Sequence, residues 1–251
     1  MDNTQNFSQL AADYTAGRPA YADGLIHLLY TRYGLSAQSV IAEIGAGTGK
    51  LSKQLLDRGS RVYAIEPNDD MRNTAIKELK SYPGFHPVKG SAEDTGLGEG
   101  TIDFITVAQA FHWFATLPFQ KECQRILRKQ GLVFLIWNMR DMNHEINQKC
   151  FELFSSYCPK FKGFGGGIKR DDPRIKEFFN RRYEYVEFDH PISYDRETFI
   201  HRSLSGSYSL RNGDPDFHSY LDALQQLYTQ YAADNALIMG NKTVAYIGSV
   251  R

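Results

Sequence analysis

The stretch Val40-Ile-Ala-Glu-Ile-Gly-Ala-Gly-Thr-Gly-Lys50 decides the fold class of this chain of 251 residues. A β-branched apolar run leads into glycines at Gly45, Gly47 and Gly49, and apolar residues at helical spacing follow in Leu51–Leu56. The pattern predicts a strand, a glycine turn and a helix. Glycine permits positive φ and lets a ligand approach bare backbone, while the start of a helix leaves amide N–H groups for an oxygen-rich ligand.

A second apolar run, Val62-Tyr-Ala-Ile-Glu66, ends in an acid about twenty residues after the glycines. A carboxylate at the end of this second strand can accept hydrogen bonds from both hydroxyls of a ribose. A phosphate-binding P-loop fits poorly, because Leu51 stands where Ser or Thr is needed. The G-x-G-x-x-G pattern of dinucleotide sites also fits poorly, because Lys50 replaces the third glycine. The spacing disfavours a P-loop and weakens, without excluding, a dinucleotide site.

The pattern Glu43-x-Gly45-x-Gly47-x-Gly49 resembles the first motif of class I S-adenosylmethionine-dependent methyltransferases. The phrase Val-Ala-Gln-Ala-Phe-His-Trp-Phe, which ends at Phe114, resembles the type 11 group of these enzymes, and within it the trans-aconitate methyltransferases and related small-molecule enzymes. The resemblance implies S-adenosylmethionine as cofactor, S-adenosylhomocysteine as its product and a small-molecule methyl acceptor. A regulatory protein that binds this cofactor without catalysis and, more remotely, a nicotinamide-dependent oxidoreductase are the alternatives.

The resemblance also implies cofactor contacts along the chain. Met71 would lie over a ring of the nucleoside, and either Ser91 or Glu93 would accept a hydrogen bond from the adenine amine. Tyr14 and Arg18 would belong to a lid over the cofactor, with an amphipathic docking arm as the alternative. The expected cofactor contacts are Tyr14, Arg18, Glu43, Gly45, Ala46, Gly47, Gly49, Glu66, Pro67, Met71, Ser91, Ala92, Glu93, Gln109 and Ala110.

The segment around His112 joins polar and aromatic residues where the carboxyl ends of parallel strands meet, so we expect it to face the transferred methyl group. His112 is a candidate general base for a hydroxyl or amine acceptor, or else a core or capping histidine. A carboxylate acceptor would need no base and would be held by arginine forks. Surface ion pairs and an ordinary polar loop are the alternatives for the arginines and serines. The expected substrate contacts are Tyr21, His112, Trp113, Asn138, Arg140, Arg202, Ser205 and Tyr208.

Alternating strands and helices predict an α/β fold with a doubly wound, mostly parallel sheet and helices on both faces. The resemblance implies a seven-stranded, Rossmann-like sheet with an antiparallel last strand and a helical cap insertion. We expect Gly131 to end the helix before the fifth strand. The predicted strands are 40–44, 62–66, 86–89, 102–108, 132–137, 183–188 and 242–248, and the predicted helices are 22–33, 51–57, 70–81 and 117–128.

The whole chain, 1–251, is expected to form a single methyltransferase domain. Its expected parts are an N-terminal lid and helix at 1–35, a cofactor-binding core at 36–142, a cap at 143–235 with a sheet-edge strand near 183–188, and a final strand at 240–251.

Composition narrows the class of partner. The chain has 29 basic and 29 acidic residues with no long basic run, so we expect no nucleic-acid partner. Cys123, Cys150 and Cys158 have no metal-ligand spacing, so no metal site is expected, and their odd number suggests reduced thiols in the cytoplasm. We see no signal-peptide pattern and no apolar run of membrane-spanning length, and therefore expect a cytoplasmic location without a membrane partner.

Overall fold

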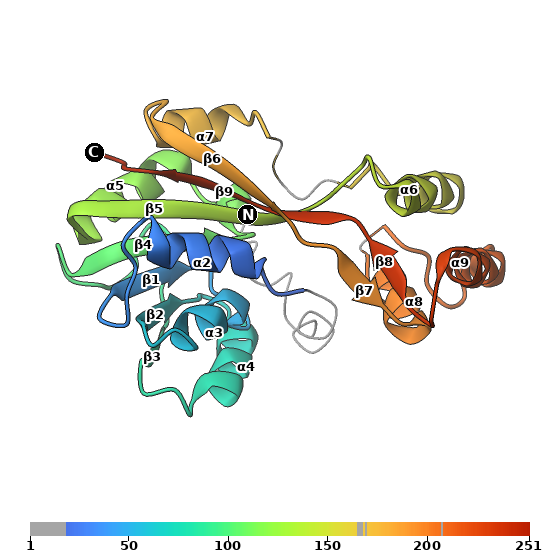
Figure 1. Ribbon diagram of the computed structural model, residues 1–251, viewed down its shortest axis with the longest axis horizontal. Helices are drawn as coiled ribbons and strands as arrows, with labels where there is room; N and C mark the ends of the chain where they lie inside the picture. Colours follow the sequence, from blue (N-terminus) through green and yellow to red (C-terminus); the bar gives the residue numbers. More distant parts are fainter. Residues whose placement is uncertain (1–18, 165–167, 169, 207) are drawn as a thin grey trace.

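A seven-stranded sheet with the strand order β3-β2-β1-β4-β5-β9-β6 forms the centre of the molecule (Figure 1). The computed structural model describes residues 19–164, 168, 170–206 and 208–251. The strands are β1 (Val40–Ile44), β2 (Arg61–Ile65), β3 (Phe85–Val88), β4 (Ile102–Ala108), β5 (Leu127–Arg140), β6 (Tyr183–Asp189) and β9 (Asn241–Gly248). Strands β1 to β5 are parallel, and β9 runs antiparallel between β5 and β6. The predicted doubly wound sheet with an antiparallel last strand is confirmed.

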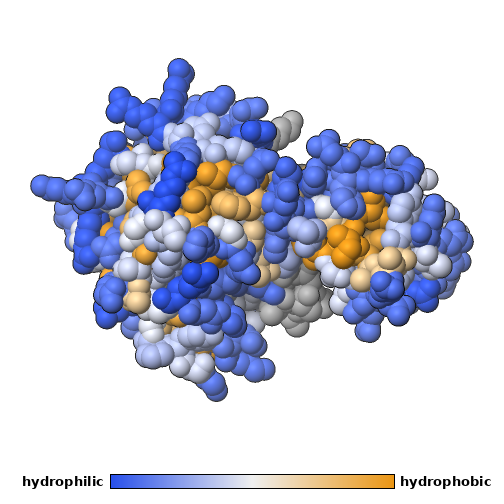
Figure 2. Space-filling view, viewed as in Figure 1, coloured by the Kyte–Doolittle hydropathy of each residue, from blue (hydrophilic) through white to orange (hydrophobic). Residues whose placement is uncertain are grey.

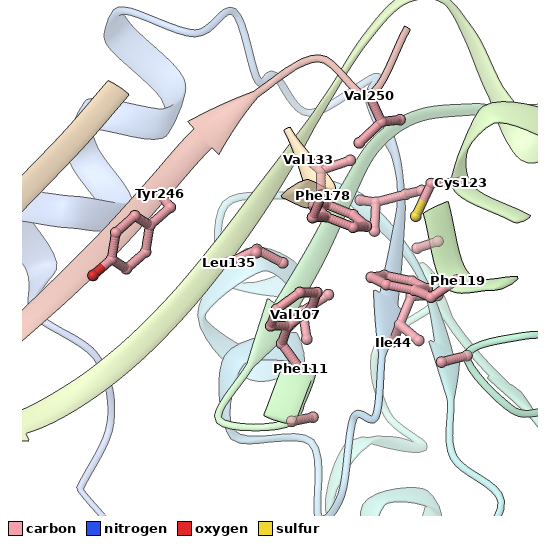
Figure 3. Packing of buried hydrophobic residues seen from close by; sticks show 14 of the residues in the cluster. Ile44, Val107, Phe111, Phe119, Cys123, Val133, Leu135, Phe178, Tyr246 and Val250 are labelled. Atoms are coloured by element: carbon pink, nitrogen blue, oxygen red, sulfur yellow. The ribbon is translucent and has the colours of Figure 1, made fainter. Parts of the chain in front are cut away.

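Helices cover both faces of the sheet because its apolar side chains alternate along each strand. On β5, Phe134 and Ile136 pack with helices α2, α3 and α4, whereas Leu135 packs on the opposite face with α5 and α7. Figure 3 shows the second of these clusters, in which the rings of Phe119 and Phe178 are stacked with centroids 5.2 Å apart. The helices are α2 (Asp23–Thr31), α3 (Lys50–Leu56), α4 (Asp69–Leu79), α5 (Thr116–Ile126) and α7 (Pro173–Phe178).

A smaller cap lies beyond the ends of β5 and β9, at the right of Figure 1. It has its own apolar cluster, which includes the buried Phe154, Tyr220 and Leu224. Its elements are α6 (Glu145–Tyr157), β7 (Ile192–Tyr194), α8 (Arg196–Leu204), α9 (Phe217–Tyr231) and β8 (Leu237–Met239). Residues 173–189 lie within the range expected for the cap but form α7 and β6, which pack with the sheet. The cap is therefore assembled from two separate segments of the chain.

Gly131 does not end a helix, so that prediction is wrong. Helix α5 stops at Ile126, and Gly131 lies within β5, near a register shift between β4 and β5. A Cβ on Gly131 would lie 2.6 Å from Cδ2 of Leu127 and 2.8 Å from the carbonyl oxygen of Asp103. Glycine is needed here because the backbone of the neighbouring strand comes too close for any side chain.

The order of the strands reverses between β1 and β4, since β1 pairs with β2 on one side and with β4 on the other. In open α/β sheets, ligands bind outside the carboxyl ends of the strands at such a switch point. The residues that follow these two strand ends are Gly45 after β1 and Gln109 after β4. The topology therefore favours a ligand site at the turns that begin at these two residues.

Three further features of the described ranges bear on possible partners and ligands. None of the helices there is both long and apolar enough to cross a bilayer. Cys123, Cys150 and Cys158 are buried free thiols. Three or more histidine, cysteine, aspartate or glutamate side chains do not gather into a possible metal site in this part of the chain.

Candidate functional site

The glycine turn after β1 divides into two packed positions and one open position. Gly45, Gly47 and Gly49 have φ values of 70°, 57° and 81°, a region that side chains rarely adopt. A Cβ would lie 2.7 Å from Ala110 Cβ at Gly45, and 2.6 Å from Leu79 Cδ1 at Gly49. At Gly47, no described atom lies within 4 Å of the Cβ position. Gly45 and Gly49 thus allow close packing, while Gly47 presents bare backbone to open space.

The carboxylate of Glu66 lies directly beside this open backbone. Its Oε2 accepts a hydrogen bond of 2.8 Å from the amide of Gly47, and its Oε1 accepts one of 2.9 Å from the amide of Asn68. The side chain is 9% exposed, and burial raises its pKa, against the lowering effect of the two amide bonds and Arg72. Glu66 therefore does not point freely into solvent, and its carboxylate oxygens are held at the rim of the glycine turn.

Glu43 supports the turn from inside the protein. It is 1% exposed in β1, and its Oε2 accepts a hydrogen bond from the hydroxyl of Ser52 on α3. Burial raises the pKa of Glu43 to about 8, and the charge of Glu66 adds to this increase. A neutral, hydrogen-bonded carboxyl thus joins β1 to the helix that follows the glycines.

The start of helix α4 forms the neighbouring wall. The side chain of Asn68 accepts a hydrogen bond of 3.0 Å from the amide of Met71 and caps the helix. Met71 is 3% exposed in the first turn of this helix. Pro67 precedes the cap and is half-buried, and its carbonyl oxygen accepts from Arg72. Glu66 and Met71 thus lie on the same short segment at the start of α4.

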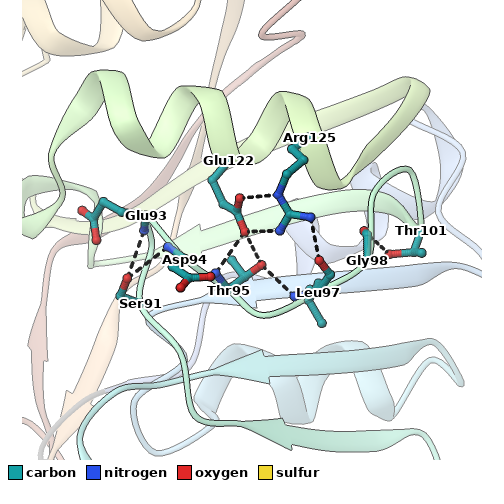
Figure 4. Close-up of polar contacts among 9 residues, drawn as sticks. All are labelled: Ser91, Glu93, Asp94, Thr95, Leu97, Gly98, Thr101, Glu122 and Arg125. Carbon is teal, nitrogen blue, oxygen red and sulfur yellow. Dashed lines mark hydrogen bonds and ion pairs between the residues drawn. The ribbon is translucent and has the colours of Figure 1, made fainter.

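The loop at residues 91–97 includes the candidates for holding adenine. The buried carboxylate of Glu122 fastens this loop to helix α5 (Figure 4). Oε1 of Glu122 accepts hydrogen bonds from the amide of Thr95 at 3.0 Å and from its hydroxyl at 2.5 Å. Arg125 forms an ion pair with Glu122 and donates to the carbonyl oxygen of Leu97 at 2.8 Å. Burial alone would raise the pKa of Glu122, but Arg125 and Thr95 hold that pKa below its usual value. Glu122 therefore joins both Thr95 and Arg125 and is a main anchor of the loop.

We expect Glu122→Ala to lower the free energy of unfolding by about 2–4 kcal/mol, because the buried amide and hydroxyl of Thr95 would lose their acceptor. Urea denaturation measures this change. Glu177→Ala, on the exposed face of α7, is the matched control and is expected to change it by less than about 0.5 kcal/mol. Equal small effects from both substitutions would show that Glu122 does not anchor the loop.

The two candidates for the adenine amine differ in what they already bind. The hydroxyl oxygen of Ser91 accepts from the amides of Glu93 and Asp94, at 3.2 Å and 3.1 Å. Glu93 uses Oε1 to accept from the amide of Ala115 at 2.9 Å. No hydrogen bond to its Oε2 is recorded among the described residues. Ala92 between them is 5% exposed.

The turn after β4 carries backbone strain that the sequence does not reveal. Gln109 has a φ of 60°, which is uncommon for a residue with a side chain and is often found at functional sites. Its amide donates to the carbonyl oxygen of Ile136 at 2.9 Å, and its side chain donates to that of Asn138 at 3.2 Å. Gln109 is thereby fixed against β5, next to Ala110, which packs under Gly45.

His112 and Trp113 follow in a short 3-10 helix, η2 (Phe111–Trp113). Their rings are 4.8 Å apart, and Trp113 is 49% exposed whereas Phe111 is buried in the core. The carbonyl oxygen of His112 accepts from Arg174 at 3.3 Å. The segment therefore presents an imidazole and an indole beside the carboxyl edge of the sheet.

Asn138 has a structural role that the sequence did not indicate. Its side-chain nitrogen donates to the carbonyl oxygen of Ala20 at 2.9 Å, and its Oδ1 accepts from Thr243 at 2.5 Å. Thr243 in turn accepts from the amide of Ala22 at 2.9 Å. The backbone of Tyr21 is held by Gln54 of α3. Asn138 therefore fastens the segment before α2 to the sheet and has its polar atoms committed to the protein.

The remaining expected substrate contacts lie at the junction with the cap. Arg140 ends β5, and its guanidinium lies 4.1 Å from the ring centroid of Phe164. Arg202 of α8 lies 5.6 Å from the ring centroid of Tyr194, and Tyr208 packs on the aromatic cluster of the cap. Ser205 is different, because it ends α8 and its hydroxyl donates to the carbonyl oxygen of Arg202 at 2.8 Å. The structure brings the two arginines together but gives Ser205 a local role.

Two expected cofactor contacts, Tyr14 and Arg18, lie outside the described residues. A separate surface hollow of about 650 Å³ is lined by residues 33–39 and 128–132, including the ion pair of Arg128 with Asp103. It lies at the amino ends of the strands, whereas ligands of open α/β sheets bind at the carboxyl ends. The turn at Gly47 and not this hollow is the candidate site.

Comparison with known proteins agrees with this location. A family model described as a methyltransferase domain, Methyltransf_11, matches residues 42–135, a range that begins in β1 and ends within β5. This segment is a class I S-adenosylmethionine-dependent methyltransferase domain. The cofactor of this methyltransferase domain is S-adenosylmethionine, and Glu43, Gly47 and Glu66 all lie within the matched range.

Similar proteins extend the likeness beyond the matched segment. An uncharacterized methyltransferase-like protein of Schizosaccharomyces pombe, C25B8.10, is 32% identical over 61% of this chain and 59% of its own length. The uncharacterized methyltransferase Rv3342 of Mycobacterium tuberculosis is 34% identical over 56% of this chain and 55% of its own. The chain thus spans less than two thirds of these curated relatives. A candidate type II methyltransferase from Anaeromyxobacter dehalogenans shares the fold of the domain, with a TM-score of 0.64 at 18% identity over 93% of this chain and 98% of its own.

Proposed function

We propose that this protein transfers the methyl group of S-adenosylmethionine to a small-molecule acceptor bound between the carboxyl edge of the sheet and the cap. One observation carries the proposal. The open backbone of Gly47 lies beside the buried carboxylate of Glu66 at the switch point of the sheet. Bare backbone suits the amino-acid end of the cofactor, and a carboxylate suits the two hydroxyls of its ribose.

The adenine would lie between Met71 and the loop that Glu122 fastens. Ser91 already accepts two amide hydrogen bonds, which use both lone pairs of its hydroxyl oxygen. Glu93 keeps its Oε2 as an acceptor. We therefore assign the adenine amine to Glu93 and the support of the turn to Ser91.

The chemistry needs little covalent help from the protein. The acceptor atom donates an electron pair to the methyl carbon while the carbon–sulfur bond breaks and its electron pair stays on sulfur, which forms S-adenosylhomocysteine. The protein aligns donor, carbon and acceptor and keeps water away. Gln109 and the η2 segment would do this at the edge of the sheet, where Gln109 is held rigidly against β5.

A small acceptor fits the shape of the molecule. Figure 2 shows the cap as a second lobe joined to the core, with apolar residues gathered on the cap beside the junction. Arg140 and Tyr208 come from the two lobes and interact electrostatically across this junction. If the acceptor binds at this junction, the cap would cover it, which suits a metabolite-sized substrate better than a folded macromolecule.

Parallel titrations with S-adenosylmethionine and NADH test the cofactor. Binding of the sulfonium nucleoside and not of NADH is expected, and the opposite result would overturn the proposed function. A library of metabolites, screened for formation of S-adenosylhomocysteine, then tests transfer. Cofactor binding without turnover of any metabolite would favour a regulatory binding protein.

His112 is proposed as the general base if the acceptor is a hydroxyl or amine. His112→Ala is then expected to lower kcat about 100-fold with little change in the affinity for S-adenosylmethionine. Steady-state kinetics with the acceptor found in the screen measures this effect, and His86→Ala, on β3, is a control histidine substitution. Unchanged turnover in His112→Ala would retire the role of a base.

A further inference from the structure

The junction between β5 and the cap contains two arginines, Arg140 and Arg202, whose positive charges act on one another. Burial lowers the pKa of the Arg140 guanidinium, and the nearby charge of Arg202 lowers it further. Like charges repel, so such a pair is kept only where something compensates it. The compensation for Arg140 within the described residues is weak. It consists of Asn147 Oδ1 at 3.4 Å and the face of Phe164, with no carboxylate in ion-pair distance.

Two phenols and a thiol that act on Arg140 supply it with no negative charge. Tyr194 and Tyr208 interact electrostatically with both guanidinium groups, yet burial raises the pKa of each phenol above its usual value. Burial likewise raises the pKa of Cys150 to about 11. These three side chains are therefore protonated near neutral pH. They do not neutralise the charge of Arg140.

The hydroxyl of Tyr194 is a candidate hydrogen-bond donor to a ligand. Tyr194 is 7% exposed, and its buried hydroxyl has no hydrogen-bond partner among the residues that the structure describes. A buried hydroxyl without a partner is costly, and native proteins rarely keep one unless a ligand or water satisfies it. The hydroxyl of Tyr194 can donate to an oxyanion that the guanidinium of Arg140 binds at the same time.

We propose that the methyl acceptor carries an anionic group, a carboxylate or a phosphate, which Arg140, Arg202 and Tyr194 bind, and that this group is the anchor and not the methylated atom. The inference rests on the proposed function. Arg140 lies two residues beyond Asn138 along β5. It is therefore about 7 Å from the point at which Gln109 is bound to β5. An acceptor anchored there extends from the cap towards the cofactor site.

Binding tests the anchor independently of catalysis. Citrate and inorganic phosphate serve as probes and glycerol as the neutral control, each titrated calorimetrically into the protein saturated with S-adenosylhomocysteine. Binding of at least one anion is expected, weakened at least tenfold in Arg140→Gln and in Tyr194→Phe. Arg196→Gln, at the start of the same helix as Arg202, is the matched control and should bind as the wild type does. Absence of anion binding, or equal binding by all variants, would overturn the proposal.

Turnover separates this proposal from the proposed function. Small carboxylic acids and phosphate monoesters are compared with their neutral amides and alcohols as acceptors, which also distinguishes a carboxylate from a phosphate anchor. For an acceptor of either kind, Arg140→Gln is expected to raise KM at least tenfold while kcat and the affinity for S-adenosylmethionine stay within twofold, and Arg140→Lys should recover part of the loss. Products should keep the anionic group unmethylated. Preferred turnover of neutral acceptors, or methylation of the sole anionic group, would reject the anchor but not the proposed methyltransferase function. Absence of cofactor binding would reject the proposed function itself.

Discussion

Gly47→Ala is expected to weaken the binding of S-adenosylmethionine about 100-fold, which corresponds to about 2.7 kcal/mol. The φ of Gly47 is 57°, and its Cβ position faces open space beside Glu66. A methyl group there would occupy the place where the cofactor approaches the backbone. The fold should remain, because no described atom within 4 Å of that position is displaced. Isothermal titration calorimetry measures the affinity.

Gly100→Ala provides a matched control for this substitution. Gly100 has a φ of 63°, and its Cβ position is also free of described atoms within 4 Å, but it precedes the amino end of β4. Both variants should lose about 1–2 kcal/mol of stability from the left-handed backbone conformation. Only Gly47→Ala should lose cofactor affinity. If the two variants bind the cofactor equally well, the cofactor does not contact Gly47.

The wild type is expected to lose stability as the pH rises. Glu43→Gln is expected to lose much less. The folded protein holds the pKa of Glu43 at about 8, compared with an ordinary value of 4.5. Because the folded-state pKa is raised, the stability that protonation contributes is fully present below about pH 4.5 and is lost as the pH rises through about 8. Between pH 5 and pH 8 the wild type should lose about 3–4 kcal/mol more than the glutamine variant.

Urea denaturation of the wild type and Glu43→Gln at several pH values measures this difference, and titrating groups that do not interact with Glu43 cancel in the comparison. Glutamine keeps an oxygen that can accept the hydrogen bond from Ser52, so the variant is expected to fold. Glu177→Gln, on the exposed face of α7, should follow the wild type across the same range. Parallel curves for the wild type and Glu43→Gln would mean that Glu43 is ionised at neutral pH.

Local patterns were enough to predict the cofactor half of the molecule. Strand, glycine turn and helix at 40–56 follow from residues close together in the chain. Gly131 was misinterpreted because a glycine after a helical pattern looks like a helix end. The close approach of β4, which is a tertiary contact, is what requires glycine there.

The acceptor half depends on contacts between distant segments, which periodicity does not reveal. Tyr194 was not among the predicted site residues, because nothing in its own surroundings in the sequence indicates that it lies within the influence of the charge of Arg140, at the end of β5. Asn138 was expected to contact the substrate, yet its amide fastens residues 19–20 to the sheet. The positive φ of Gln109 likewise has no signal in the sequence, since its side chain is not one that usually adopts this conformation.

A structure of the protein with bound S-adenosylhomocysteine tests the central claim most directly. We predict the nucleoside beside Gly47, with both ribose hydroxyls donating to the carboxylate of Glu66 at about 2.6–2.9 Å. The adenine should lie against Met71, with its amine donating to Glu93. A nucleoside bound elsewhere, for instance in the hollow beside Arg128, or a ribose out of reach of Glu66, would contradict the account.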